Sequence, residues 1–90
     1  MNIGIFDSGI GGLTLLHQAV VLMPQENYIF YADTDHVPYG TKSKEQVVSY
    51  VDEAIRFMMA HQCKAVVIAC NTATAVAAEV MRRTYEIPII

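Results

Sequence analysis

The sequence has little positive charge and no concentration of it. Lysine and arginine together number 6 in 90 residues, against 9 aspartates and glutamates, and they are scattered along the chain. Proteins that bind nucleic acids or anionic lipids gather basic residues on one surface. The sequence therefore predicts neither a nucleic-acid partner nor a membrane partner.

Long apolar runs are also missing. No run approaches the roughly 18 residues that a membrane-spanning helix needs, and the first residues lack the basic stretch and apolar core of a secretory signal. Cysteine is scarce, with only Cys63 and Cys70. A strand between them would separate their Cα atoms by more than the roughly 7 Å that a disulfide tolerates. We therefore expect two free thiols in a reducing, cytoplasmic compartment.

What the chain has in excess is hydrophobic residues. They make up 53% of the 90 residues, whereas charged residues make up 17%. A compact chain of this size buries only about 60–65% of its unfolded surface, and the remainder needs polar cover. We therefore expect that further protein covers part of this chain, and that residues 1–90 are a fragment of a larger domain.

Short apolar runs alternate with segments of helical spacing. Strands are predicted at 2–7, 28–33 and 65–69, with a fourth beginning at 87–90. Helices are predicted at 13–23, from Ser43 onward, and at about 71–85, where Asn71 or Thr72 is expected to cap the helix. Ser43 and Gln46 resemble a capping box, and the helix that they open has an apolar stripe at Val47, Val48, Val51, Ile55 and Met58. This alternation predicts an α/β fold, an open parallel sheet with helices on both faces in the doubly wound manner. A loop at 34–42 joins the second strand to the second helix.

Polar residues follow each predicted strand, as Asp7-Ser8, Asp33 and Cys70-Asn71-Thr72. Because ligands bind beyond the carboxyl ends of parallel strands, we expect these residues to meet at one edge. Cys70 comes where a helix begins, and unpaired N–H groups there stabilise a thiolate. A small buried residue at a strand end is the alternative interpretation of Cys70.

The other candidates have structural alternatives too. Asp7 either orients a neighbouring thiol or caps the glycine turn that follows it. Residues Pro38, Tyr39 and Gly40 either present a backbone N–H and a phenol to a small ligand or form an ordinary turn. The three histidines show no metal-ligand spacing.

The glycine turn at 9–12 also suggests a dinucleotide-binding loop, with Asp33 near the position of a ribose contact. However, Thr14 stands where that fingerprint needs glycine. No phosphate loop of the Walker type is present, because no Gly-Lys-Ser/Thr follows the turn.

Three segments together resemble the aspartate/glutamate racemase superfamily, and glutamate racemase most closely. They are Gly4–Thr14, Tyr31–Lys42 and Ala69–Ala75, in order and with appropriate separations. The resemblance implies that the chain is the amino-terminal part of the first domain of a two-domain enzyme. The second domain and a segment returning to the first domain would lie outside residues 1–90.

The resemblance also implies a reaction and its residues. Two cysteine thiols would interconvert L- and D-glutamate by moving the Cα proton, without a cofactor or metal, and supply D-glutamate for peptidoglycan. Cys70 would act on D-glutamate with help from Asp7. The implied substrate-binding residues are Ser8, Pro38, Tyr39, Gly40, Asn71 and Thr72. The second catalytic cysteine would lie beyond residue 90, so we expect residues 1–90 alone to be inactive and the full-length enzyme to be a homodimer.

Three other interpretations remain open at this point. They are a nucleotide-binding module, a non-catalytic domain whose polar strand ends only cap turns, and a racemase of the same superfamily acting on a different small acid.

Overall fold

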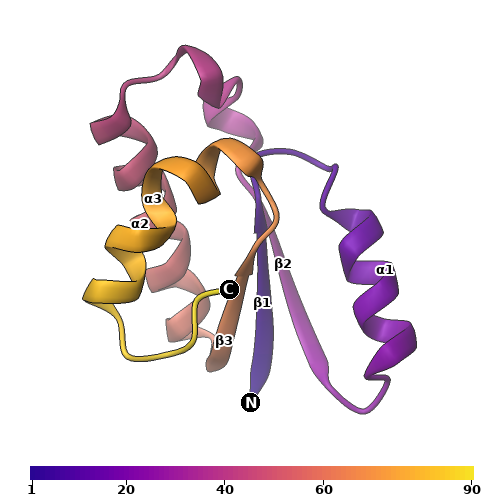
Figure 1. Ribbon diagram of the computed structural model, residues 1–90. Coiled ribbons are helices and arrows are strands. Elements are labelled where there is room, and N and C mark those ends of the chain that lie inside the picture. Colours follow the sequence, from indigo (N-terminus) through magenta and orange to yellow (C-terminus); the bar gives the residue numbers. More distant parts are fainter.

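The computed structural model describes residues 1–90 and is built on a three-stranded parallel sheet of order β2-β1-β3 (Figure 1). Strand β1 (Asn2–Asp7) is central, and β2 (Asn27–Ala32) and β3 (Cys63–Ile68) pair with its two edges. The register pairs Phe6 with Tyr31 of β2 and with Ile68 of β3. The first strand therefore forms the axis of the fold.

Helices lie on both faces of this sheet. Helix α1 (Leu13–Leu22) is on one side, and α2 (Lys44–Ala60) and α3 (Asn71–Thr84) are on the other (Figure 1). The crossover between β2 and α2 contains two short 3-10 turns, Thr34–His36 and Tyr39–Thr41. This arrangement confirms the predicted open parallel α/β fold.

The core lies between the sheet and the α2/α3 layer. Phe6 and Val66 are fully buried on this face of the sheet. The apolar stripe of α2 packs there as predicted, although Val48 is only partly buried; the buried members are Val47, Val51, Ala54, Ile55 and Met58. Helix α3 contributes small side chains and one long one, namely Ala73, Ala77, Ala78 and Met81. Small residues let α3 approach α2 and the sheet closely.

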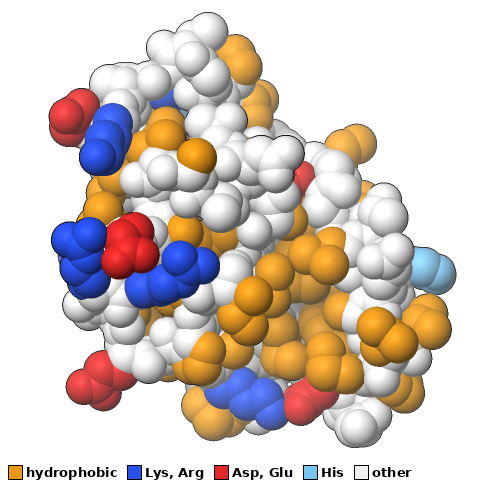
Figure 2. Space-filling model, in the orientation of Figure 1, with side chains coloured by type: hydrophobic (Ala, Val, Ile, Leu, Met, Phe, Trp, Pro, Cys, Tyr) orange, Lys and Arg blue, Asp and Glu red, His pale blue; other side chains and the backbone are white.

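The α1 face is much less covered. No residue of α1 is buried, and Val21 and Leu22 are 65% and 79% exposed. Figure 2 shows hydrophobic side chains gathered on the surface between α1 and the carboxyl end of the chain. The hydroxyl of Tyr28 lies 3.0 Å from the carbonyl oxygens of both Ala19 and Met23, and its one proton, shared between these acceptors, links the helix to β2. The excess of hydrophobic residues noted in the sequence therefore lies largely on this side.

Several predicted boundaries differ from the observed ones. Strand β2 covers Asn27–Ala32 rather than 28–33, and α1 and β3 end one residue earlier than predicted, at Leu22 and Ile68. Strand β3 begins at Cys63 rather than residue 65, because Cys63 pairs with Asn2 across an irregular step in the register. The predicted fourth strand is reduced to a single parallel bridge between Val66 and Ile89, held by backbone hydrogen bonds on the free edge of β3. None of the helices combines the length and apolar composition needed to cross a membrane.

Helix α2 starts at a complete capping box, as predicted. The Ser43 hydroxyl accepts from the Gln46 N–H at 3.1 Å, and the Gln46 side chain accepts from the Ser43 N–H at 2.9 Å. This pair satisfies two N–H groups that the helix itself leaves unpaired.

Replacement of this cap should destabilise the fold. We expect Ser43→Ala to lower the free energy of unfolding by about 1 kcal/mol, measured by urea denaturation. Ser49→Ala is the matched control, because Ser49 is exposed inside the same helix. That control should be neutral or slightly stabilising, since alanine is the better helix former. Equal losses in the two variants would contradict the capping assignment.

Candidate active site

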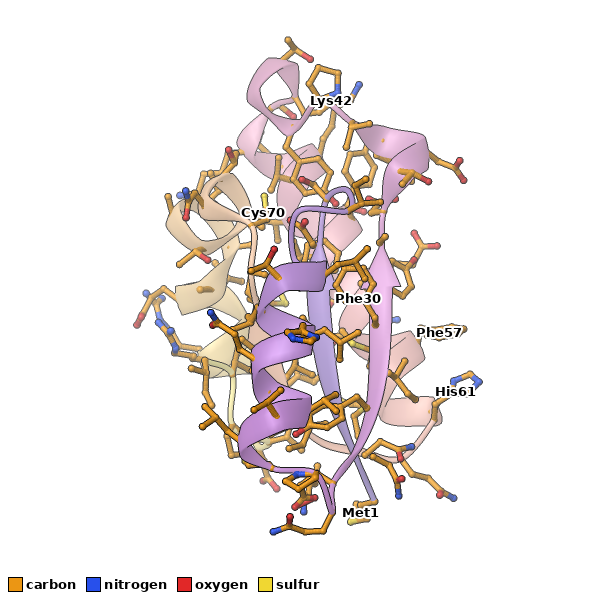
Figure 3. All side chains as sticks on the ribbon, turned by 90° about the vertical axis from the view of Figure 1, so that its right-hand side faces the viewer. Met1, Phe30, Lys42, Phe57, His61 and Cys70 are labelled. Carbon is orange, nitrogen blue, oxygen red and sulfur yellow. The ribbon has the colours of Figure 1, made fainter.

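The carboxyl ends of the three strands meet at one edge, as the sequence predicted. The N–H of Asp33 donates to the Asp7 carbonyl at 2.9 Å, and the N–H of Ala69 donates to the Phe6 carbonyl at 2.7 Å. These bonds continue the sheet pairing past the strand ends. Figure 3 shows Cys70 at the end of the sheet opposite Met1, on the side of the loop that carries Lys42.

Cys70 is the N-cap residue of α3 and is 9% exposed. The prediction of Asn71 or Thr72 as the cap was therefore wrong by one or two residues. The cause is Thr74, whose backbone N–H and hydroxyl both donate to the Cys70 carbonyl at 2.9 Å and so start the helix there. At a helix start the first N–H groups have no partner within the helix, and the dipole is positive. Negative charge beside Cys70 is consequently stabilised.

The residues that follow Cys70 differ in exposure. Asn71 is exposed and Thr72 is partly buried. Both belong to the first turn of α3, so their backbone N–H groups are among those without an intrahelical partner. This turn is suited to receive a carboxylate of a small ligand.

Asp7 is buried, and both of its carboxylate oxygens are occupied. Oδ1 accepts from the Ser8 N–H at 2.9 Å, and Oδ2 accepts from the Gly12 N–H at 2.7 Å. Asp7 therefore fixes the glycine turn, which is the structural role foreseen for it. Ser8 is held partly buried at the start of this turn.

The same contacts argue against a dinucleotide at the glycine turn. A pyrophosphate would need the free N–H groups of that turn. Here the Gly12 N–H is already bound to the Asp7 carboxylate, and the Leu13 N–H donates to the Ile10 carbonyl. The buried negative charge of Asp7 would in addition repel a phosphate.

The loop at 34–42 brings Tyr39 into the core beside the site. Tyr39 is 4% exposed, whereas Pro38 and Gly40 on either side are exposed. Its hydroxyl donates to Asp33 Oδ2 at 2.5 Å. Burial raises the pKa of Tyr39 far above its ordinary value, and the hydrogen bond to Asp33 and the charges of Asp33 and Cys70 raise it further. The phenol therefore stays protonated.

From the sequence, Asp33 was expected at the edge where the strand ends meet and was considered as a ribose contact, but no structural role was predicted for it. The structure instead makes it the acceptor for Tyr39 and for His36, whose Nδ1 lies 2.7 Å from Asp33 Oδ1. No spacing rule links these three residues, because the contacts depend on how the loop turns. The position of Asp33 at a strand end was the only available signal.

Cys63 is the first residue of β3, at the end of the strand opposite Cys70, and is 3% exposed. A Cβ atom at Gly4 would lie 3.2 Å from its Sγ atom and 2.6 Å from Met58 Sδ, so this thiol is enclosed in the core. Burial raises the pKa of the Cys63 thiol. Cys63 is therefore a packing residue and not part of the site.

Other features of the molecule do not add ligands to the site. No group of three or more His, Cys, Asp or Glu side chains is arranged to hold a metal ion. The one surface pocket is a shallow hollow on α1, lined by His17, Gln18, Val21 and Leu22. Within residues 1–90, this hollow does not include the edge around Cys70.

The curated proteins that are similar in sequence to this chain include several glutamate racemases. Glutamate racemase from Lachnospira eligens is 57% identical over 90 residues, and glutamate racemase 2 from Bacillus subtilis is 56% identical over 90 residues. This chain is covered completely in both alignments but spans only 34% of each relative. No protein-family model matches the chain.

Solved structures give the same result. Glutamate racemase from Aquifex pyrophilus has a TM-score of 0.95 at 38% identity, covering 100% of this chain and 36% of that one. Glutamate racemase from Francisella tularensis, solved in complex with D-glutamate, has a TM-score of 0.89 at 38% identity, covering 99% and 34%.

Fold, edge residues and similarity together define the chain as a member of the aspartate/glutamate racemase superfamily. Within that superfamily it belongs to the glutamate racemase family, and it corresponds to the amino-terminal third of those proteins.

Close packing of the glycine turn provides a test of the site's geometry. A Cβ atom at Gly12 would lie 3.0 Å from Phe30 Cε1, 3.1 Å from Asp7 Cβ and 3.3 Å from Ala69 Cβ. We expect Gly12→Ala to lower the free energy of unfolding by about 1–3 kcal/mol, because the turn and two strand ends must move apart.

Gly9→Ala is the control for this prediction, since a Cβ atom there has no neighbour within 4 Å. Urea denaturation of both variants measures the difference. A Gly12→Ala protein as stable as Gly9→Ala would show that the turn is not packed as described.

Proposed function

We propose that this chain is the amino-terminal part of the first domain of a glutamate racemase, an isomerase that interconverts L- and D-glutamate. One observation carries the proposal. Cys70 stands at the start of α3 on the edge where the strand ends converge, in a chain that is 57% identical over its whole length to a glutamate racemase. The relatives solved with D-glutamate and with L-glutamate support the substrate.

The proposed chemistry is a proton exchange between two thiols. The Cys70 thiolate removes the Cα proton of D-glutamate, so that an S–H bond forms and the C–H electron pair stays on the substrate. A second cysteine, outside residues 1–90, then donates its proton to the opposite face of Cα. Cys70 thus ends as a thiol and the second cysteine as a thiolate, ready for the reverse reaction.

The Cα proton of an amino acid is very weakly acidic, so the site must stabilise the developing carbanion. Preorganised donors in a water-poor site supply most of such stabilisation. The first turn of α3, at Asn71 and Thr72, is suited to a substrate carboxylate. The Ser8 turn and the loop of Pro38, Tyr39 and Gly40, in which Pro38 and Gly40 are exposed, border the same edge and complete the proposed substrate site.

Asp7 is proposed to assist Cys70 indirectly, by fixing the glycine turn that borders the site. Its carboxylate bonds keep the Ser8–Gly12 turn in place beside the end of β3. A fixed turn keeps the ligand and the thiol in one relative orientation, which is a large part of catalytic efficiency.

The wider biological role follows from the same proposal. The enzyme would work in the cytoplasm without a cofactor or metal, as a homodimer at full length. Its product, D-glutamate, would enter peptidoglycan and so support cell-wall formation and cell shape. The Escherichia coli relative, solved with the activator UDP-MurNAc-ala, supports a link to cell-wall precursors.

Cys70 is the residue whose removal tests the proposal. In the full-length racemase, we expect Cys70→Ala to reduce kcat for racemisation of either enantiomer by at least about 10²–10⁴-fold, because the base is lost. Circular dichroism of a D-glutamate solution measures the turnover. Cys63→Ala is the matched control, and its kcat should stay close to wild type. Racemisation by Cys70→Ala at the wild-type rate would remove the mechanism.

Residues 1–90 alone are expected to show no racemisation. Two-base exchange needs a second thiol on the other side of Cα, and Cys63 is buried at the opposite end of β3. The measurement is turnover by purified residues 1–90 at high protein concentration. Activity in that preparation that Cys70→Ala abolishes would contradict the need for a second thiol.

A further inference from the structure

We propose that Asp33 is a positioning residue, which holds the 34–42 loop and with it Tyr39 against the Cys70 end of the sheet. The inference rests on the proposed racemase function and deepens it, because that loop carries part of the proposed substrate site. Asp33 acts through Tyr39 and does not touch the reacting atoms.

The carboxylate of Asp33 is buried, and both of its oxygens have hydrogen-bond partners. It is 7% exposed, with Oδ2 accepting from the Tyr39 hydroxyl at 2.5 Å. The His36 Nδ1 atom lies 2.7 Å from Oδ1 and 3.0 Å from Oδ2. Because a carboxylate only accepts hydrogen bonds, this Nδ1 atom carries a proton. One carboxylate therefore fixes the loop at two points.

Asp33 is itself fixed to the sheet. Its N–H donates to the Asp7 carbonyl at 2.9 Å, so its backbone is joined to the end of the central strand. The anchor of the loop and the residue that holds the glycine turn are thus neighbours. A displacement of Asp33 would therefore move both the 34–42 loop and the glycine turn.

Aromatic packing completes the attachment on the side of α2. The His36 ring stacks on the Tyr50 ring with centroids 3.8 Å apart and planes 12° apart. The Tyr39 ring lies 5.9 Å from Tyr50 and 6.3 Å from Phe6, centroid to centroid. The loop is therefore held between the end of β1 and α2, and its second 3-10 turn contacts α3.

This arrangement limits what Tyr39 contributes to substrate binding. A phenol has one proton, and that of Tyr39 is committed to Asp33. The hydroxyl is therefore no donor for a glutamate carboxylate. Tyr39 serves to place the exposed backbone of Pro38 and Gly40, whose position then decides how well glutamate is held.

The test uses the full-length racemase and the variants Asp33→Asn, Tyr39→Phe and the double variant. Each single change should raise KM for both enantiomers of glutamate about tenfold, the loss expected from weakening a hydrogen bond to a charged group. The kcat value should change by less than about threefold, since the loop binds ground state and transition state alike. The double variant should be no more impaired than Asp33→Asn alone, because Asp33→Asn already weakens the bond that Tyr39→Phe removes.

A second tyrosine–aspartate pair provides the matched control. The Tyr85 hydroxyl donates to Asp52 across α2 and the end of α3, away from the Cys70 edge. Asp52→Asn removes the same kind of charged acceptor, and it should leave KM and kcat unchanged even if it lowers the free energy of unfolding.

Alkylation of Cys70 by iodoacetamide gives a readout that needs no turnover. Asp33→Asn and Tyr39→Phe should each speed alkylation of Cys70 about fivefold by releasing the loop, an effect within the tenfold bound above. Asp52→Asn should not change this rate, and Cys63 should stay unreactive in every variant. Absence of glutamate turnover in the wild-type enzyme would defeat the proposed function, while the alkylation rates would still decide the role of Asp33. Wild-type rates in Asp33→Asn, an unchanged KM in an active enzyme, or multiplying effects in the double variant would overturn the inference.

Discussion

Parallel strands share one direction, so their carboxyl ends must open on the same edge of the sheet. In this chain the backbone pairing continues beyond the strand ends, through the Asp33 N–H on the Asp7 carbonyl and the Ala69 N–H on the Phe6 carbonyl. That pairing brings residues far apart in sequence to one place. The thiol at the start of α3, the glycine turn and the 34–42 loop each follow one of these strand ends, so the pairing of the strands brings them to the same edge.

Asp7 and Asp33 are both buried carboxylates on this edge, and both are stabilised by hydrogen bonds from the segment that follows them. A buried charge is costly unless it is hydrogen-bonded. Asp7 meets that cost with the N–H groups of the glycine turn, and Asp33 meets it with the side chains of the following loop. Each carboxylate thereby makes a flexible connection rigid. Cys70 thus lies beside the glycine turn fixed by Asp7, the 34–42 loop fixed by Asp33 and the first turn of α3. The helix supplies the electrostatic stabilisation of negative charge at this edge.

Local signals in the sequence predicted much of this arrangement. Strand β1 and the start of α2 were predicted at the observed residues, because Asp7 with the glycine turn and the capping box at Ser43 are local stop and start signals. Features that depend on distant contacts were not predictable. The cap of α3 is Cys70 rather than Asn71 or Thr72, because Thr74 bonds back to the Cys70 carbonyl. The link from Asp33 to Tyr39 depends on the path of the loop.

The central place of β1 also governs the order of events during biosynthesis. Of the three strands β1 is made first, yet one of its edges waits for β3, the last of them. Pairing across such a long separation is slow, and an unpaired apolar strand is prone to aggregation meanwhile. On the ribosome, β1 and β2 can therefore pair early, while the Cys70 edge takes shape only after β3 and α3 have emerged.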